Sequence, residues 1–255
     1  MTRLGVFHRG LARQPLLASL LQAEVVRSGW WPCGHLDGCL AWGRSPHGWL
    51  ARFTAAARGW PLLTLEDGFL RSFRPGPAHT ALSVVVDPTG IHYDCTRPSA
   101  IEQWLASEEN LLDQGTARDV ARARALIAAH GLSKYNHAPA LAHVEASSGR
   151  PLLRPGDRQR VLVVDQTAGD LSIAFGAASA RTFDEMLVAA LTDNPEATVY
   201  VKSHPEVTSG HKAGHFSHLR DTERVVVLRE AIEPLSLLRQ MDAVYVVSST
   251  LGFEA

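Results

Sequence analysis

Four short runs of apolar, largely β-branched residues in the second half of the chain constrain its fold most strongly. They are Val161–Asp165, Thr198–Lys202, Arg224–Leu228 and Ala243–Val247, and polar turns bound each of them. Residues 182–194 carry apolar side chains at i, i+3, i+4, i+7 and i+8, which predicts an amphipathic helix with a capping box formed by Thr182 and Glu185. A shorter helix is predicted over residues 233–241, with Pro234 in its first turn. Strands that alternate with helices favour a parallel sheet of Rossmann-like type.

The first half repeats this alternation less regularly. Strands are predicted over residues 4–10, 38–43 and 61–68, and helices over residues 15–26, 46–59, 99–112 and 117–131. Gly131 is the expected C-cap of the last helix. Residues 81–94 predict a hairpin, because Asp87-Pro88-Thr89-Gly90 has the composition of a turn between two apolar runs.

Gly, Pro and charged residues concentrate over residues 147–160, which is typical of a linker. The sequence therefore predicts two Rossmann-like domains, 1–148 and 149–255, that face each other across a cleft. The chain ends in VVSSTLGFEA, where a helix should begin. We therefore expect a C-terminally truncated fragment whose second domain is incomplete.

Composition narrows the function classes. The 255 residues carry a formal net charge of −1, so bulk electrostatics do not favour a nucleic-acid partner. The three cysteines form no CxxC pair, which fits a reducing compartment with packed thiols: Cys33, Cys39 and Cys95. The sequence has no signal-peptide pattern and no apolar run of membrane-spanning length, so a cytoplasmic protein is expected.

Polar groups follow five of the predicted strands. In open α/β sheets the ligand lies beyond the carboxyl ends of the strands, so these groups are candidates for a site. They are His8-Arg9-Gly10, Glu66-Asp67-Gly68, Asp165-Gln166, Ser203-His204-Pro205 and Ser248-Ser249-Thr250. Loops are polar in any protein, and so each group also has a purely structural interpretation.

The stretch VLVVDQTAGDLSI (161–173) places two acids, an amide and a hydroxyl at one strand exit. It is either a reaction centre or a polar loop that caps a core strand. The groups are Asp165, Asp170, Gln166 and Ser172.

The other strand ends allow the same choice. Glu66 and Arg71 suit an acid oriented by an arginine, although Asp67-Gly68 could simply be a turn. Lys202 and His204 alternate along one strand end, so they could present two cationic donors to a phosphate or belong to a solvated loop. The hydroxyls of residues 248–250 could cap a helix, receive an anion at its start, or do both.

No metal or cofactor is predicted. Three histidines lie within residues 211–218, but no acid or cysteine is placed to complete a metal site. The sequence contains no HExxH, P-loop, GxSxG, GxGxxG or Asp-x-Asp motif. A nucleoside monophosphate leaving group could be held by lysine and histidine alone.

Eight motifs occur in an order that resembles a known family. They are WGR (42–44), LEDGFLRS (65–72), SVVVDPTGIHYD (83–94), RPSAIEQWL (97–105), LSKYN (132–136), VLVVDQTAGDLSI (161–173), VKSHPEV (201–207) and SSTLGFEA (248–255). Nearly the whole chain is similar to the capsule polysaccharide biosynthesis proteins of Gram-negative bacteria. These are retaining β-Kdo transferases that build a Kdo linker on a phosphatidylglycerol anchor. The sequence VVDQTAGD (163–170) resembles that of the first of two tandem modules in that family.

The resemblance implies a GT-B-like fold, CMP-Kdo as the donor and a lipid-linked Kdo acceptor. It also implies retention through a covalent glycosyl–aspartate intermediate, without a metal. An oxocarbenium-like transition state at the ketose carbon suits one trapping carboxylate and a second acid. Other capsule biosynthesis and export proteins at the inner membrane are the expected partners, with the chain peripheral to that membrane.

The same resemblance assigns residue roles. Asp170 is the expected nucleophile with Asp165 as the second choice, and Glu66 is the expected general acid/base across the cleft. Arg71 would hold Glu66 or the Kdo carboxylate. The expected donor-binding residues are Gln166, Ser172, Lys202, His204, Pro205, Ser248, Ser249, Gly252 and Glu254; of these, Lys202 and His204 would bind the CMP phosphate, and Glu254 the ribose.

Two alternatives stay open from the sequence. The chain could be a non-catalytic nucleotide-binding or assembly module, since a truncated fragment could lack activity. It could also transfer another acidic sugar, such as a sialic acid, from a CMP donor.

Overall fold

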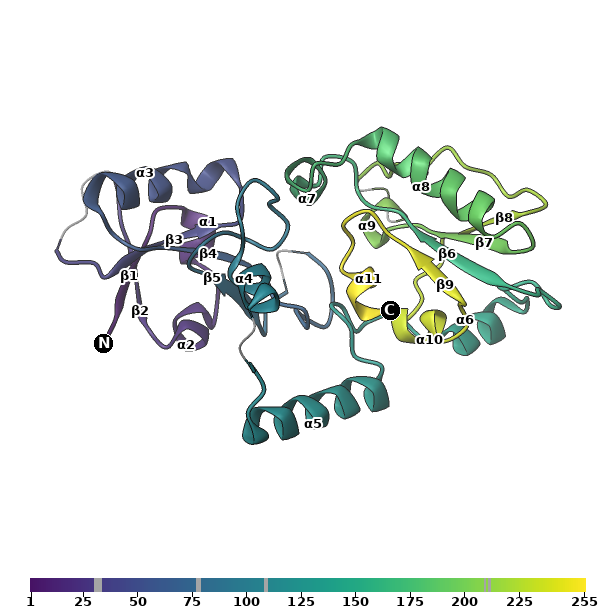
Figure 1. The fold of residues 1–255 in the computed structure, drawn as a ribbon, viewed down its shortest axis with the longest axis horizontal. Helices are drawn as coiled ribbons and strands as arrows, with labels where there is room; N and C mark the ends of the chain where they lie inside the picture. Colours follow the sequence, from purple (N-terminus) through teal and green to yellow (C-terminus); the bar gives the residue numbers. More distant parts are fainter. Residues whose placement is uncertain (30–33, 77–78, 108–109, 209, 211) are drawn as a thin grey trace. The chain divides into compact units, whose positions relative to one another are not determined.

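The computed structural model describes residues 1–29, 34–76, 79–107, 110–208, 210 and 212–255. The chain divides into two compact units, Met1–Ala123 and Arg124–Ala255, each built from a largely parallel sheet with helices on its faces (Figure 1). The prediction of α/β architecture with parallel sheets is therefore confirmed.

The sheet of the first unit has the strand order β2-β1-β3-β4-β5. The first four strands run parallel, and β5 pairs antiparallel with β4. The strands are β1 (Arg3–Val6), β2 (Glu24–Arg27), β3 (Gly38–Trp42), β4 (Leu62–Asp67) and β5 (Val84–Asp87). The helices are α1 (Arg9–Ala12), α2 (Leu17–Leu21), the 3₁₀ turn η1 (Pro46–Gly48), α3 (Trp49–Arg58) and α4 (Ala100–Ala106).

Alternate residues of these strands pack on opposite faces. On one face, Leu4, Val6 and Leu40 pack with Leu11 and Leu17 from α1 and α2. On the other face, buried residues of β3 meet buried alanines of α3: Cys39, Ala41, Ala51 and Ala55. Cys39 is thus packed as expected, whereas Cys95 is exposed and Cys33 lies outside the described residues.

Two predicted elements of this unit are shorter than expected: the strand over 4–10 ends at Val6 before α1, and the helix over 99–112 ends at Ala106. Two other predictions are wrong in kind. The predicted helix over 15–26 ends at Leu21, because Gln22 is left-handed (φ 49°) and the β-branched Val25 and Val26 enter the sheet as β2. The hairpin predicted over 81–94 is absent from the described residues, because β5 pairs with β4 instead.

The Asp87 carboxylate explains this change of direction. Its Oδ1 accepts hydrogen bonds from the backbone N–H groups of Thr89 (2.8 Å) and Gly90 (2.7 Å), which forms the predicted turn. Its Oδ2 accepts a hydrogen bond from Ala100 N (2.9 Å), which ties the turn to the start of α4. The chain therefore continues into a helix and does not return as a strand.

Helix α5 (Gln114–His130) contains the division between the two units and ends at Gly131 (φ 62°), as predicted. The predicted boundary at 148/149 falls within the second unit. Residues 147–160 are not a linker between the units, because Leu152 and Leu153 are buried against the second sheet beside α6 (Leu141–Ser148).

The second sheet is entirely parallel, with the order β8-β7-β6-β9. All four predicted strands are present, with ends shifted by one or two residues in three of them: β6 (Arg160–Val164), β7 (Thr198–Lys202), β8 (Val225–Leu228) and β9 (Ala243–Tyr245). The helices after α6 are α7 (Leu171–Phe175), α8 (Ala180–Asp193), α9 (Pro205–Thr208), α10 (Pro234–Leu238) and α11 (Leu251–Glu254).

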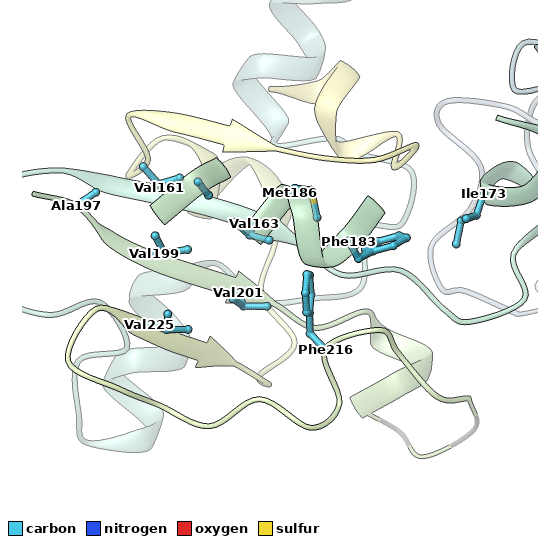
Figure 2. Packing of buried hydrophobic residues seen from close by; sticks show 11 residues of the cluster. Val161, Val163, Ile173, Phe183, Met186, Ala197, Val199, Val201, Phe216 and Val225 are labelled. Carbon is cyan, nitrogen blue, oxygen red and sulfur yellow. The ribbon is translucent and has the colours of Figure 1, made fainter. Parts of the chain in front are cut away.

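Both faces of this sheet are apolar, as expected for parallel strands covered on two sides. On one face, Val161, Val163, Val199 and Val201 pack against Phe183 of α8 (Figure 2). On the other face, the strand residues meet buried leucines of α6 and α10: Leu162, Val164, Tyr200, Leu141 and Leu237.

Helix α8 begins earlier than predicted. Its N-cap is Ser179, whose backbone N–H donates to Thr182 Oγ1 (3.1 Å), so Thr182 is the third helical residue and not the cap. Glu185 instead pairs with Arg181 on the exposed surface (2.7 Å).

Each sheet has one position where the strand order reverses. In the first unit it lies between β1 and β3, and in the second between β6 and β9. Crossover connections leave in opposite directions from such a position, so the loops diverge and leave room for a ligand beyond the strands' carboxyl ends.

We expect Phe183→Ala to lower the free energy of unfolding by about 3–5 kcal/mol, because the ring is fully buried between helix and sheet. Val188→Ala on the same helix is the matched control, since that side chain is 61% exposed and should change stability by less than about 0.5 kcal/mol. Urea denaturation followed by circular dichroism measures both. Equal losses for the two variants would contradict the packing described.

Candidate active site

Asp165 follows β6 and is almost fully buried, with 1% of its surface exposed. Its Oδ1 accepts three backbone hydrogen bonds, from Gln166 N (2.9 Å), His215 N (2.9 Å) and Phe216 N (3.3 Å). Burial raises the pKa of Asp165, although these N–H donors act in the opposite direction. This carboxylate therefore fixes the loop 214–216 against the strand end.

The same loop approaches Asp165 closely at Gly214. A Cβ atom on Gly214 would lie 2.2 Å from Asp165 Oδ2, so only glycine fits beside the carboxylate. The sheet-like bridge between Thr167 and Gly214 adds a second attachment of this loop. The role of residues 214–216 is not predictable from the sequence, because their partner is 50 positions away and the loop carries no recognisable motif.

Asp170 has the opposite environment. It is exposed and is the N-cap of α7, where its Oδ1 accepts a hydrogen bond from Ser172 N (2.9 Å). The preceding Gly169 has φ 84°, a left-handed conformation that turns the chain out of the strand. Of the two predicted nucleophiles, only Asp170 thus presents its carboxylate to solvent.

Gln166 and Ser248 join the two strand ends at the reversal of strand order. Gln166 Nε2 donates to Ser248 Oγ (3.0 Å), and Gln166 Oε1 accepts from Ser248 N (3.0 Å). Ser248 Oγ also lies 3.0 Å from Ser172 Oγ, within hydrogen-bond distance. Three predicted site residues are therefore brought together from two segments: Gln166 and Ser172 after β6, and Ser248 after β9.

Lys202, at the end of β7, is half-buried and turned toward the backbone. Its Nζ donates to the carbonyl oxygens of Ser203 (3.1 Å) and Glu230 (3.0 Å). Burial lowers the pKa of Lys202 to about 8, and the Glu230 carboxylate opposes that shift. The ammonium group is therefore positive at pH 7 but close to its titration range.

His204 accepts a hydrogen bond from Glu206 N at Nδ1 (3.2 Å), so its neutral ring carries the proton on Nε2. Burial lowers the pKa of His204, while the nearby carboxylates of Glu206 and Asp170 raise it. The neutral ring therefore offers its Nε2–H group as a donor in the vicinity of Asp170.

Three of the four remaining predicted donor-binding residues have contacts within the second unit: Ser249, Gly252 and Glu254. Ser249 Oγ accepts from Leu251 N (3.3 Å) at the start of α11. Gly252 packs so tightly that a Cβ atom would lie 2.5 Å from Val246 Cγ2. Pro205 is the first residue of α9. Glu254 Oε1 accepts from Lys134 N (2.9 Å) in the LSKYN motif, and burial raises the pKa of this carboxyl.

In the first unit, Arg71 is buried and has two side-chain partners in its own motif. Its Nε donates to Asp67 Oδ1 (2.7 Å) and its guanidinium also donates to Ser72 Oγ (2.9 Å). The LEDGFLRS motif is thus held together by Asp67 and Arg71, which lie four residues apart.

Glu66 is half-buried at the end of β4, beside the WGR motif. A Cβ atom on Gly43 would lie 2.7 Å from Glu66 Oε2 and 2.1 Å from the Tyr93 hydroxyl. That hydroxyl accepts a hydrogen bond from Arg44 N (2.9 Å). Three of the motifs noticed in the sequence therefore meet around Glu66, a neighbourhood that their separation in the sequence concealed.

Across the part of the chain that the structure describes, no group of three His, Cys, Asp or Glu side chains is arranged to hold a metal ion. His211, the first histidine of the cluster over 211–218, lies outside the described residues. In the same part of the chain, no helix combines the length and apolar character needed to cross a membrane.

We expect Asp165→Ala to lower the free energy of unfolding by about 2–5 kcal/mol, because three backbone donors lose their acceptor. Asp165→Asn keeps an acceptor oxygen and should lose less than about 1 kcal/mol at pH 7. Similar losses for the two variants, measured by urea denaturation, would contradict this role of the carboxylate oxygen.

The pH dependence of the same variants provides a second readout. Burial raises the folded-state pKa of Asp165, so the folded chain binds this proton more tightly than the unfolded chain. Its contribution to stability therefore falls as the pH rises from the unfolded value, about 3.9, through the folded one. Asp165→Asn should lack this fall, so its stability relative to wild type should improve as the pH rises from about 4 to 7.

Comparison with known proteins agrees with the motif pattern. Residues 39–255 match the family described as "Capsule polysaccharide biosynthesis protein". Capsule polysaccharide modification protein LipA of Neisseria meningitidis serogroup B is 41% identical over 249 residues, which cover 97% of this chain and 34% of LipA. Lipopolysaccharide-processing protein LpsZ of Rhizobium meliloti is 41% identical over 200 residues, covering 76% of this chain and 43% of LpsZ. The chain spans about a third to less than half of these relatives.

Two solved structures are similar. The Thermosulfurimonas dismutans KpsC structure described as a beta Kdo 2,4 transferase has a TM-score of 0.88 at 39% identity, covering 99% of this chain and 76% of that one. The KpsC structure described as a beta Kdo 2,7 transferase has a TM-score of 0.57 at 21% identity, covering 100% and 75%, and supports the fold alone. On its sequence match and its relatives, this chain belongs to the capsule polysaccharide biosynthesis protein family.

Proposed function

We propose that this chain is a glycosyltransferase module that moves Kdo from CMP-Kdo to a lipid-linked Kdo acceptor during capsule synthesis, with retention of anomeric configuration. The similarity to a structure described as a beta Kdo 2,4 transferase supports the sugar and the reaction class. The two parallel α/β units support the GT-B-like architecture of the proposal.

The proposed mechanism rests on the different exposure of the two aspartates after β6, Asp165 and Asp170. Asp165 is buried and its Oδ1 is occupied by three N–H groups, so it is unsuited to attack a substrate. Asp170 is exposed at the reversal of strand order. We therefore assign Asp170 as the nucleophile and Asp165 as the residue that supports its loop.

The first step breaks the bond between the ketose carbon of Kdo and the phosphate oxygen of CMP. An Asp170 carboxylate oxygen forms a new bond to that carbon, and CMP leaves with the electron pair of the broken bond. The product is a glycosyl ester of Asp170 with inverted configuration. A carboxylate suits this position because the transition state carries positive charge at the ketose carbon.

In the second step an acceptor hydroxyl attacks the same carbon, and the ester bond to Asp170 breaks. The second inversion restores the original configuration. Glu66 is the proposed base that takes the hydroxyl proton, and Asp67 with Arg71 stiffens the loop that follows it. Gly43 and Tyr93 limit the space beside the Glu66 carboxylate.

The donor phosphate is assigned to the ends of β7 and β9. His204 offers a neutral Nε2–H group, and Lys202 contributes positive charge from a half-buried position. Ser248 and Ser172 are oriented through the Gln166 amide. Ser249, Pro205 and Gly252 shape the two short helices at this edge, and Glu254 remains the proposed ribose ligand.

The chain spans less than half of its curated relatives, and we therefore propose the acceptor and the place of reaction from the family resemblance. We propose a Kdo-bearing phosphatidylglycerol lipid as the acceptor and the cytoplasmic surface of the inner membrane as the place of reaction. Other capsule biosynthesis and export proteins are the proposed partners there.

Intact-protein mass spectrometry after incubation with CMP-Kdo tests the nucleophile. We expect wild type to gain the mass of one Kdo residue and to release CMP, whereas Asp170→Asn should do neither, because an amide is a poor nucleophile. Asp184→Asn is the matched control, since Asp184 is an exposed aspartate on α8 and should behave as wild type.

The outcomes separate the alternatives. An adduct on Asp170→Asn would remove Asp170 from the role. CMP binding without adduct or release in any variant would favour the non-catalytic nucleotide-binding module. A larger mass gain from a CMP-sialic acid than from CMP-Kdo, at equal concentrations, would favour another acidic sugar.

The affinity for CMP should depend on the protonation of Lys202. Its pKa is lowered to about 8, so a rise in pH from 7 to 9 removes a positive charge near the phosphate, and the Kd for CMP should increase several-fold. In Lys202→Met this pH dependence should disappear, because no proton is lost. Isothermal titration calorimetry measures the effect.

Lys212→Met is the control for general charge. Lys212 forms an exposed ion pair with Glu206 (2.9 Å), so the pH dependence should persist in this variant. Loss of the pH dependence in Lys212→Met but not in Lys202→Met would contradict the assignment of the phosphate to Lys202 and favour Lys212.

A further inference from the structure

Helix α3 of the first unit is apolar on two faces. It lies on one face of the first sheet, where Ala51 and Ala55 pack against buried residues of β3 (Figure 1). Its outer face carries Phe53, Ala56 and Ala57, which are all exposed, and 61% of the Phe53 surface is in contact with solvent. A surface helix ordinarily turns charged or polar side chains away from the core. The outer face of α3 is therefore a candidate for an interaction surface.

Tryptophans stand at both ends of this helix. Trp49, the first helical residue, lies one turn before Phe53 and is half exposed. Trp60 follows the helix, and the Arg58 guanidinium carbon lies 5.5 Å from the centroid of its ring. Aromatic rings with arginines beside them are typical of segments that lie at the boundary between lipid headgroups and acyl chains.

The charge around the helix favours an anionic surface. The charged residues of α3 are Arg52 and Arg58. Residues 1–60 contain seven of the 25 lysines and arginines of the chain but only two of its 26 acidic residues. Both of those acids contact Arg3 at the start of β1. The first 60 residues thus carry an excess of positive charge in a chain whose formal net charge is −1.

The two arginines of the helix have different environments. Arg52 is half-buried, and its guanidinium donates to the carbonyl oxygens of Ser45 (2.7 Å) and Gly43 (3.3 Å). It therefore fastens the loop before the helix. Arg58 is exposed in the last turn, so it is the cation of α3 that can meet an anion in solvent.

The size of the outer face favours a bilayer over a protein. The helix has ten residues and is therefore about 15 Å long. A stable protein–protein interface uses about 20–30 residues on each side. A bilayer needs no matching partner surface, because apolar side chains enter the acyl boundary while neighbouring cations stay among the headgroups.

We propose that the outer face of α3 docks the first unit on a bilayer of anionic phospholipids, with Phe53 in the acyl boundary and Arg58 at the headgroups. This inference rests on the proposed function and deepens it, because it names the surface through which a transferase with a lipid-linked acceptor would lie on the membrane. No donor-binding or catalytic residue takes part in it.

Co-sedimentation of the whole chain with phospholipid vesicles tests the proposal. We expect tighter binding to vesicles of equal parts phosphatidylcholine and phosphatidylglycerol than to vesicles of phosphatidylcholine alone, by about fivefold or more. A rise in ionic strength from about 0.1 M to about 1 M shortens the Debye length from about 10 Å to about 3 Å and should remove this preference.

Two variants separate the apolar part from the electrostatic part. Phe53→Ser should weaken binding to both kinds of vesicle by about tenfold, because the ring is no longer withdrawn from water. Arg58→Gln should weaken binding to the anionic vesicles alone, by about fivefold. Phe53→Leu keeps an apolar side chain and should stay within about threefold of wild type.

Val188→Ser is the matched control. Val188 lies on α8 of the second unit and has the same exposed fraction as Phe53, 61%, so its loss should leave vesicle binding unchanged. Equal losses in Val188→Ser and Phe53→Ser would overturn the assignment to α3. So would a dimer in sedimentation velocity that Phe53→Ser dissociates without a change in vesicle binding, because a second copy would then cover this face.

Release of CMP from CMP-Kdo without vesicles is followed in parallel and should be equal in wild type and Phe53→Ser. Its absence in wild type, with Phe53-dependent vesicle binding intact, would defeat the proposed transfer and keep the membrane surface. CMP release together with vesicle binding that does not depend on Phe53 would do the reverse.

Discussion

The sheet of the second unit is apolar on both faces, and this constraint decides where its polar chemistry can lie. Val161 and Val163 face α8, whereas Leu162 and Val164 face α6 and α10, so β6 has no side free for a reacting group. Polar side chains emerge only where the strands end. Parallel strands end at the same edge, and the residues after β6, β7 and β9 are therefore gathered without any long-range motif.

Two acids within six residues lie in opposite environments at that edge of the sheet. Asp165 lies directly after β6, and its carboxylate accepts hydrogen bonds from the loop 214–216. Asp170 lies one turn further along, past a left-handed glycine, and stays in water. The loop that Asp165 holds also pairs through Gly214 with Thr167, so the buried acid helps to fix the segment that leads to Asp170.

Sequence patterns predicted the strands of the second unit well, because each is a continuous apolar run bounded by turns. They failed at β2, where a short strand follows a helix after only Gln22 and Ala23 and no Gly or Pro marks the boundary, and at the predicted hairpin, where the chain continues to α4 through Asp87. Motifs named candidate site residues but not their partners: Arg71 contacts Asp67, and Asp165 contacts a loop 50 positions away. Such pairings depend on tertiary packing, which local periodicity does not encode.

Gly43 carries a consequence for anyone who diversifies this scaffold. Its φ of 38° already disfavours side chains, and the space its Cβ would need is occupied by the Glu66 carboxylate and the Tyr93 hydroxyl. Any other residue would have to move the backbone and one of these groups at once. A saturation library that searches for new specificity around Glu66 should therefore hold Gly43 fixed and vary its neighbours, since variants at this codon will be lost before selection can compare them.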